Sequence, residues 1–113
     1  DPVTGLFSAA AAWQRIRGEA NRAQRLQLPL HVWIGTAPSS EVLDVEGARL
    51  ADQLPSGAMG VRIARDRVCL VSCVEGESPA SLTDQLEWRS RRIAPGDDAA
   101  VAALAFVSEA TDA

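Results

Sequence analysis

The chain has 113 residues, a length that suits one domain built around one hydrophobic core. Apolar residues make up 47% of it, which predicts a folded domain and excludes an intrinsically disordered chain. The net charge is −4, so no overall positive charge attracts nucleic acid, and no apolar run approaches the ~20 residues of a membrane span.

The two cysteines, Cys69 and Cys73, lie four residues apart in an apolar run. On a strand they would face the same side at a separation of ~13 Å, which is too far for a disulfide. We expect two buried free thiols, which fit a reducing cytoplasm, and no signal peptide is visible. His31 is the only histidine, so the soft ligands of a zinc site are missing, and it is expected in the core. The sequence thus predicts a cytoplasmic protein without a metal or other cofactor.

The first half of the chain predicts a helix, a strand and a second helix. Residues 8 to 27 repeat apolar side chains at helical spacing, and Ser8 is a suitable N-cap. The apolar run 30–34 is typical of a buried central strand. Residues 41 to 54 place leucines in register on a second helix. The expected apolar stripe of the first helix is Ala9, Trp13, Ile16, Ala20 and Ala23, and both Trp13 and Trp33 are expected in the core.

The second half predicts a hairpin, a third helix and a last strand. Residues 59–64 and 67–74 form the hairpin, whose turn contains no glycine. A third helix is expected to open at Ser78-Pro79, because proline suits the first helical position. Its apolar face would be Leu82, Leu86, the stem of Arg89, and Ile93. In the run 101–107 the alanines favour a helix but the position in the pattern favours a strand, and a strand is predicted.

After the first helix the predicted order is β-α-β-β-α-β. This is the ferredoxin-like arrangement, a four-stranded antiparallel sheet with helices on one face. The predicted fold class is therefore α+β, ferredoxin-like, with an extra N-terminal helix. Such a fold by itself settles no function.

Two segments of the chain carry recognisable motifs, DPVTGLFS at its start and VRIARDRVCLV at 61–71. They resemble the D-x-L-T-G-L-x-N-R opening and the A-R-L-G-G-D-E-F-A-L-L signature of GGDEF domains, the diguanylate cyclase family. Arg62 and Ile63 match the pair before the two glycines, and the run 68–71 matches the strand after the acids. The resemblance covers essentially the whole chain and implies a GGDEF-like fold.

The signature loop departs from the family pattern. In the family the glycines let backbone approach the nucleotide, and the acids help to hold a divalent cation and the attacking hydroxyl. Here Ala64 and Arg65 replace the glycines, Asp66 keeps the first acid, and Arg67 replaces the second. The first strand, which should end in a metal-binding aspartate, ends instead at Gly35-Thr36. Mg²⁺ needs oxygen ligands, so the resemblance implies a degenerate site without catalytic activity.

Other parts of the family's machinery are also missing. The segment that supplies guanine contacts is shortened, and the R-x-x-D inhibitory motif falls on Pro55 and Ala58. The sequence Arg49-Leu50-Ala51-Asp52 does spell R-x-x-D, but too early and on a helix, and is interpreted as an exposed pair. The chain stops after the last predicted strand, so we expect the family's terminal helix to be absent. Residues 1–113 are expected to be a single GGDEF-like domain excised from a longer protein.

The sequence offers one candidate contact surface, made of Trp88, Arg89, Arg91 and Arg92 at the end of the predicted third helix. Trp88 lies off the apolar stripe, and exposed tryptophan beside arginine is typical of an interface. The alternative is that the arginines only interact favourably with the helix C-terminus.

These observations predict a catalytically inactive regulatory module in bacterial cyclic di-GMP-related signalling. Its partner would be a protein or other domains of the same chain, with a homodimer left open and nucleic acid excluded. One alternative is a non-catalytic sensor of GTP or a cyclic dinucleotide. Another, which sets the resemblance aside, is a ferredoxin-like module that binds a small effector.

Overall fold

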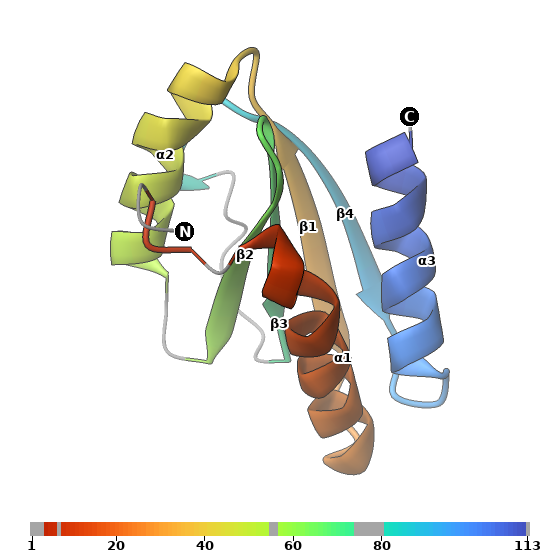
Figure 1. Cartoon of the computed structure of the whole chain (residues 1–113). Helices are drawn as coiled ribbons and strands as arrows, with labels where there is room; N and C mark the ends of the chain where they lie inside the picture. The colour runs from red at the N-terminus through yellow and green to blue at the C-terminus, as the bar shows by residue number, and fades with distance from the viewer. Residues whose placement is uncertain (1–3, 7, 55–56, 74–80, 113) are drawn as a thin grey trace.

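Four strands and three helices form the domain in a computed structural model that describes residues 4–6, 8–54, 57–73 and 81–112 (Figure 1). In chain order they are α1 (Ala9–Arg25), β1 (Leu30–Thr36), α2 (Ser40–Gln53), β2 (Ala58–Ala64), β3 (Arg67–Ser72), β4 (Glu87–Ile93) and α3 (Ala99–Asp112). None of the described helices is long and apolar enough to cross a membrane.

The strands form one antiparallel sheet in the order β2-β3-β1-β4. Strand β1 lies in the middle, with Val32 opposite Val71 of β3 on one side and Arg91 of β4 on the other. This is the strand order of the ferredoxin-like arrangement, so the predicted α+β fold class is confirmed. Strands β2 and β4 are the two edges of the sheet.

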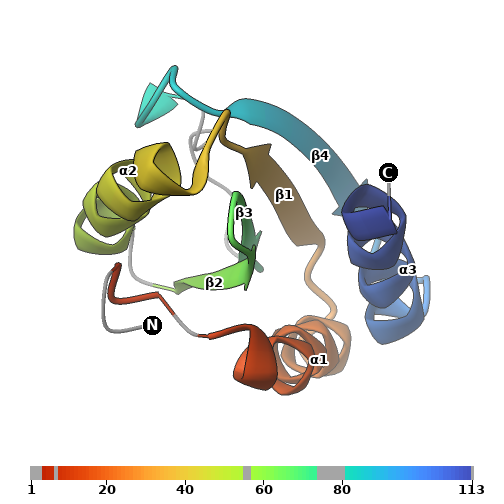
Figure 2. The same cartoon turned by 45° about the horizontal axis from the view of Figure 1, so that its top comes forward.

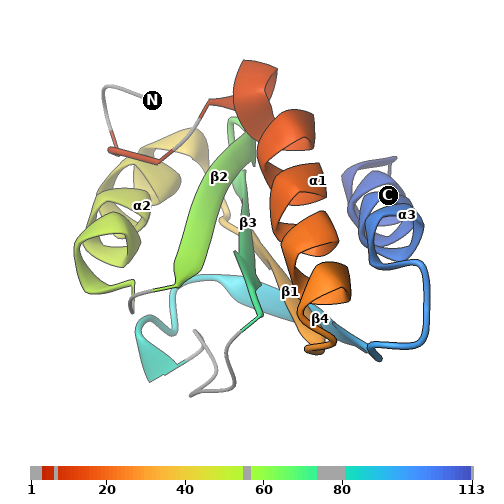
Figure 3. The same ribbon diagram turned by 90° about the horizontal axis from the view of Figure 1, so that it is seen from below.

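Helices cover both faces of the sheet, whereas the sequence analysis expected them on one. Figures 2 and 3 show α1 and α3 together on one side and α2 on the other. The reason lies in β1 and β3, which carry apolar side chains on both faces. Val32 and Cys69 pack with α1 and α3, while Val68 and Leu70 pack with the α2 side. A sheet that is apolar on both faces must be covered on both to keep that area from water.

The predicted third helix is wrong over the part of it that the structure describes. Residues 81–86 form short turns, and the segment that follows is the strand β4. Leu86 and Ile93 are buried as predicted, but on opposite faces of the sheet. Trp88, Arg89, Arg91 and Arg92 therefore lie along an edge strand and not at a helix end.

The last strand predicted at 101–107 is also wrong, because this segment lies within α3. Alanine has the highest helix propensity, and it dominates this run. Asp98 begins the helix by accepting a hydrogen bond from the Val101 N–H at 3.2 Å, and Ala103, Phe106 and Val107 are buried against the sheet. The chain thus ends in a helix, contrary to the expectation that none would follow the sheet.

Three residues predicted in the core are more exposed than expected. The prediction is wrong for Trp13, which is 46% exposed. Ile16, Ala20 and Ala23 of the predicted stripe of α1 are buried, and Ala12 takes the place of Trp13. Trp33 is half-buried and packs against the apolar cluster on the α2 face. His31 is also half-buried, with its ring stacked on that of Trp33 at 5.4 Å, so it is not the core histidine that was expected.

Candidate functional site

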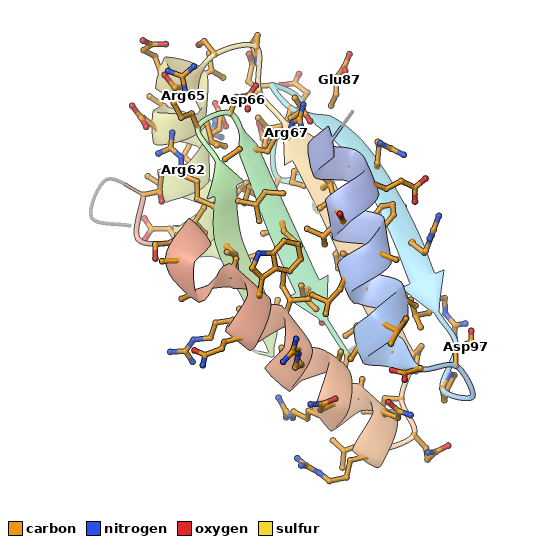
Figure 4. All side chains as sticks on the ribbon, turned by 45° about the vertical axis from the view of Figure 1, so that its right-hand side comes forward. Arg62, Arg65, Asp66, Arg67, Glu87 and Asp97 are labelled. Atoms are coloured by element: carbon orange, nitrogen blue, oxygen red, sulfur yellow. The ribbon has the colours of Figure 1, made fainter. Side chains whose placement is uncertain are left out.

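The candidate site is the tip of the β2–β3 hairpin, together with the end of β1 and the start of α2. Arg65 and Asp66 form a two-residue turn, and Ala64 pairs with Arg67 (Figure 4). A register shift between Arg62 and Ala64 precedes it. Among the described non-glycine residues only Gln27 has a positive φ, so this turn does not need the backbone that favours glycine. A register shift of this kind, as in a β-bulge, increases the local twist of the two strands, which a primed turn would otherwise supply.

The hairpin tip is fixed to the neighbouring elements through backbone and side chain. The Ala37 N–H, just after β1, donates to the Asp66 carbonyl at 2.7 Å. The α2 helix starts nearby, where the Ser39 hydroxyl accepts a hydrogen bond from the Val42 N–H at 3.2 Å. The first bond joins the end of β1 to the turn, and the second caps the start of α2.

Arg62 joins the hairpin to α2. Its side chain is only 14% exposed and forms an ion pair with Asp44 at 2.8 Å. The same guanidinium donates to the carbonyl of Arg65 at 2.6 Å and to that of Ser40 at 3.4 Å. Sequence reasoning matched Arg62 to the GGDEF signature but missed Asp44, which a helical pattern gives no reason to single out.

Arg67 joins the hairpin to α3. Its guanidinium donates to the Ala110 carbonyl at 2.8 Å, in the last turn of the helix. Carbonyls at a helix C-terminus lack intrahelical partners and carry partial negative charge, so a cation there is favourable. The residue that replaces the second acid of the signature thus has a structural contact with the terminal helix. Sequence reasoning missed this contact because α3 had been expected to be absent.

Gly35 and Trp88 meet where a metal-binding aspartate was expected at the end of β1. The two residues are partners in the β1–β4 register. A Cβ atom built on Gly35 would lie 2.8 Å from the Trp88 ring, closer than side-chain carbons approach. The indole Nε1 also donates to the Thr83 carbonyl at 3.5 Å, which holds the ring in this place. The space beside Gly35 is therefore filled by an aromatic ring.

The site does not fit a divalent cation. No group of three or more histidine, cysteine or acidic side chains forms a metal-ligand cluster in the described part of the chain. Asp66 is the carboxylate that the loop retains, and Asp44 is paired with Arg62. Mg²⁺ prefers several oxygen ligands, and one carboxylate beside the cationic Arg67 is a poor set.

A hollow of about 440 Å³ lies beside the site, lined by Thr36, Ala37, Pro38, Gln85 and Glu87. One carboxylate, that of Glu87, and a few neutral polar groups line it. Figure 4 shows Glu87, at the start of β4, on the same side of the molecule as the hairpin tip. This hollow is the space that a small ligand near the hairpin could use.

The cysteines are both free and buried, as predicted. Burial raises the pKa of the Cys69 thiol to about 12, so it stays protonated at neutral pH. A thiol in that state is a poor nucleophile and a poor metal ligand. Cys69 and Cys73 thus contribute to the core on the α1 and α3 face.

One of the two positions of the inhibitory motif lies at the start of β2. Ala58 is the first residue of that strand, and Pro55 lies outside the described residues. On α2, Arg49 pairs with Glu46 at 3.1 Å. The Arg49–Asp52 pair that was expected from the sequence is not the ion pair that forms there.

The candidate contact surface is divided between the two faces of β4. Trp88 lies on the α2 face, half-buried rather than exposed as predicted. Arg89 and Arg91 lie on the α3 face, with their guanidinium carbons 6.0 Å and 4.8 Å from the centre of the Phe106 ring. Both arginines are exposed. Phe106 was missed as a partner because its segment had been predicted to be a strand.

Comparison with known proteins gives matches in structure only. No protein-family model and no curated protein sequence matches the chain. Among solved structures, the GGDEF domain of FimX from Pseudomonas aeruginosa matches 99% of this chain and 90% of its own, with 15% identity and a TM-score of 0.68. A DGC protein from Thermotoga maritima matches 96% and 98%, with 13% identity and a TM-score of 0.66.

A third similar structure contains a protein partner. This structure is the diguanylate cyclase SiaD from Pseudomonas aeruginosa in complex with its activator SiaC. The structural alignment covers 97% of this chain and 58% of the matched chain. The identity is 17% and the TM-score 0.61. The order of the strands and these likenesses agree with the resemblance seen in the sequence. The chain is a GGDEF-like domain in its fold.

Proposed function

We propose that this domain is a catalytically inactive GGDEF-like module that acts through protein contacts in cyclic di-GMP-related signalling. The observation that carries the proposal is the contact between Gly35 and Trp88. An aspartate at position 35 would need the space that the indole fills. The second acid of the signature is replaced by Arg67, whose side chain holds α3.

The charge balance of the hairpin supports the same conclusion. Joining two nucleotides requires a cation to neutralise charge on the phosphates. Asp66 is the only carboxylate of the turn, and Arg67 places a positive charge next to it along the chain. The hairpin retains its fold because Arg62 and Arg67 hold it to α2 and α3.

A protein partner is supported by the SiaD structure, in which a diguanylate cyclase binds its activator SiaC. Strand β4 of this chain presents exposed arginines, a residue type enriched in interfaces. The partner would be a separate protein or another domain of the same polypeptide.

The direct test is a turnover assay with GTP and Mg²⁺ at high protein concentration, analysed by chromatography for linear and cyclic dinucleotides. An active diguanylate cyclase serves as the positive control. We expect no product above a protein-free blank. Product that increases with protein concentration and disappears in Asp66→Asn would show that the hairpin is still a catalytic site and would overturn the proposal.

A nucleotide sensor is the second candidate, and the hollow beside the hairpin is the observation in its favour. Calorimetry with GTP and with cyclic di-GMP tests it. Under the first proposal neither ligand binds in the micromolar range. Micromolar binding that is lost on Gln85→Ala, and kept in the matched surface variant Gln24→Ala, would favour the sensor.

A further inference from the structure

The edge strand β4 has hydrogen-bonding groups that no described strand uses. It is the last strand of the sheet and pairs with β1 along one side only (Figure 1). In an edge strand, alternate residues direct their N–H and C=O groups outward, where another chain can pair with them. Natural edges are often protected by proline, by shortening or by charged side chains. Strand β4 has no proline and runs for seven residues, Glu87–Ile93, so its protection is its charge, which repels a like-charged strand but not an oppositely charged one.

The charges along β4 are spaced for a strand and not for a helix. Arg89 and Arg91 are two residues apart and face the same side, so their Cα atoms are separated by about 7 Å. Both guanidinium groups lie over the Phe106 ring of α3, which limits their orientations. Neither forms an ion pair with a carboxylate among residues 4–6, 8–54, 57–73 and 81–112.

A second copy of the chain is a poor occupant of this edge. Two β4 strands paired antiparallel about Ser90 would place Arg89 of each opposite Arg91 of the other. Like charges directly opposite in a sheet are destabilising. The charge of the strand favours a partner of the opposite sign.

We propose that the outer edge of β4 binds an extended acidic segment of a partner protein as a fifth strand, with two carboxylates two residues apart against Arg89 and Arg91. Backbone pairing supplies affinity, and the spacing of the carboxylates supplies specificity. The inference rests on the proposed function, since it names the class of partner that the inactive domain binds.

The probe is a labelled peptide in which glutamate and valine alternate, titrated with the whole domain and followed by fluorescence anisotropy and amide NMR shifts. Three matched peptides serve as comparisons. One has the same composition but adjacent glutamates, one has glutamine in place of glutamate, and one carries N-methyl groups on alternate backbone amides. Only the first peptide is expected to bind well, with the largest shifts in β4.

The protein variant is Arg89→Gln with Arg91→Gln. The control is Arg17→Gln with Arg25→Gln, which removes the same charge from exposed positions on α1. We expect the β4 variant to weaken binding at least about tenfold and the α1 control to change it less than about twofold. Circular dichroism checks that both variants fold, and the N-methyl peptide tests strand addition on the unaltered protein if they do not.

Several results would overturn the inference. Equal binding of the alternating, adjacent-glutamate and N-methyl peptides would show a non-specific basic patch. Shifts outside β4, self-association through β4, no binding at all, or stronger binding of single-stranded DNA than of the peptide would each exclude this partner. If the turnover assay instead yields cyclic dinucleotide, the proposed function fails whatever the peptide does. If turnover is absent and the peptide does not bind, only the strand addition fails.

Discussion

The β2–β3 hairpin and the strand β4 are both rich in arginine, but they use it differently. In the hairpin, Arg62 and Arg67 form hydrogen bonds with Asp44, Arg65 and Ala110 at 2.6–2.8 Å. On β4, Arg89 and Arg91 contact the face of an aromatic ring and remain exposed. The first pair stabilises the fold, whereas the second leaves its hydrogen-bond donors to solvent or to a partner. Residue type alone therefore does not identify a contact surface.

The largest effect on stability is expected when the Arg62 side chain is replaced, which tests whether the hairpin arginines stabilise the fold. Arg62→Met keeps the apolar stem but leaves Asp44 and two carbonyls without their donor. We expect the free energy of unfolding to fall by about 2–3 kcal/mol. Urea denaturation followed by circular dichroism measures it. Arg65→Met, at an exposed position of the same turn, should cost less than about 0.5 kcal/mol. Equal losses in the two variants would show that the network does not stabilise the hairpin.

The two regions should also differ in how alkaline pH affects their contribution to stability. Strand β3 carries the Cys69 thiol, which can lose its proton, whereas the arginines of β4 keep their charge. The pKa of Cys69 is raised from 9.0 to about 12 in the folded protein. Its stabilising effect is therefore complete below pH 9.0 and is lost as the pH rises towards 12. In that interval the free energy of unfolding should fall by up to about 1.4 kcal/mol per pH unit.

The chain contains no lysine and no tyrosine that would titrate in the same range, and comparison with Cys69→Val separates Cys69 from the second thiol, Cys73. Urea unfolding at about pH 8 and about pH 10 gives the slope, and Cys69→Val should flatten it. If Cys69→Val loses as much stability in alkali as the native sequence does, another group is responsible.

A smaller effect is expected at Arg67. Arg67→Met removes the donor from the Ala110 carbonyl and the cation from the end of α3. The free energy of unfolding should fall by about 1 kcal/mol, with amide exchange increasing mainly in the last turn of α3. Hydrogen-exchange mass spectrometry measures the second effect. Uniform exchange changes across the domain, with none concentrated in α3, would contradict this role.

The smallest effect on stability is expected on β4. Arg89→Gln with Arg91→Gln removes two exposed cations from the Phe106 ring and should cost about 0.5 kcal/mol. If this variant keeps its stability but no longer binds the acidic peptide, the arginines of β4 serve binding, in contrast to those of the hairpin. A loss as large as that of Arg62→Met would place the β4 arginines among the structural ones.

The sequence was sufficient to predict the hairpin, the first two helices and the central strand. In β3 every residue from Val68 to Val71 is apolar, and β1 alternates between a buried and a half-buried face, so local pattern and final environment agree. The predicted loop residues Ala64 to Arg67 do form the turn between β2 and β3. These elements can be predicted because the pattern of apolar side chains within each segment already indicates its secondary structure and its buried face.

Only the tertiary structure determined that β4 is a strand, that α3 is a helix, and which groups the arginines contact. Residues 87–93 contain few apolar side chains, and they form a strand because β1 offers an unpaired edge beside them. The alanine-rich segment after Asp98 does not join the sheet but forms the helix that its composition favours, with Ala103, Phe106 and Val107 buried against the sheet. Trp88 covers Gly35, and Arg67 reaches Ala110, only because these chain segments are brought together by the fold. Such contacts join residues far apart in sequence, and no local pattern encodes them.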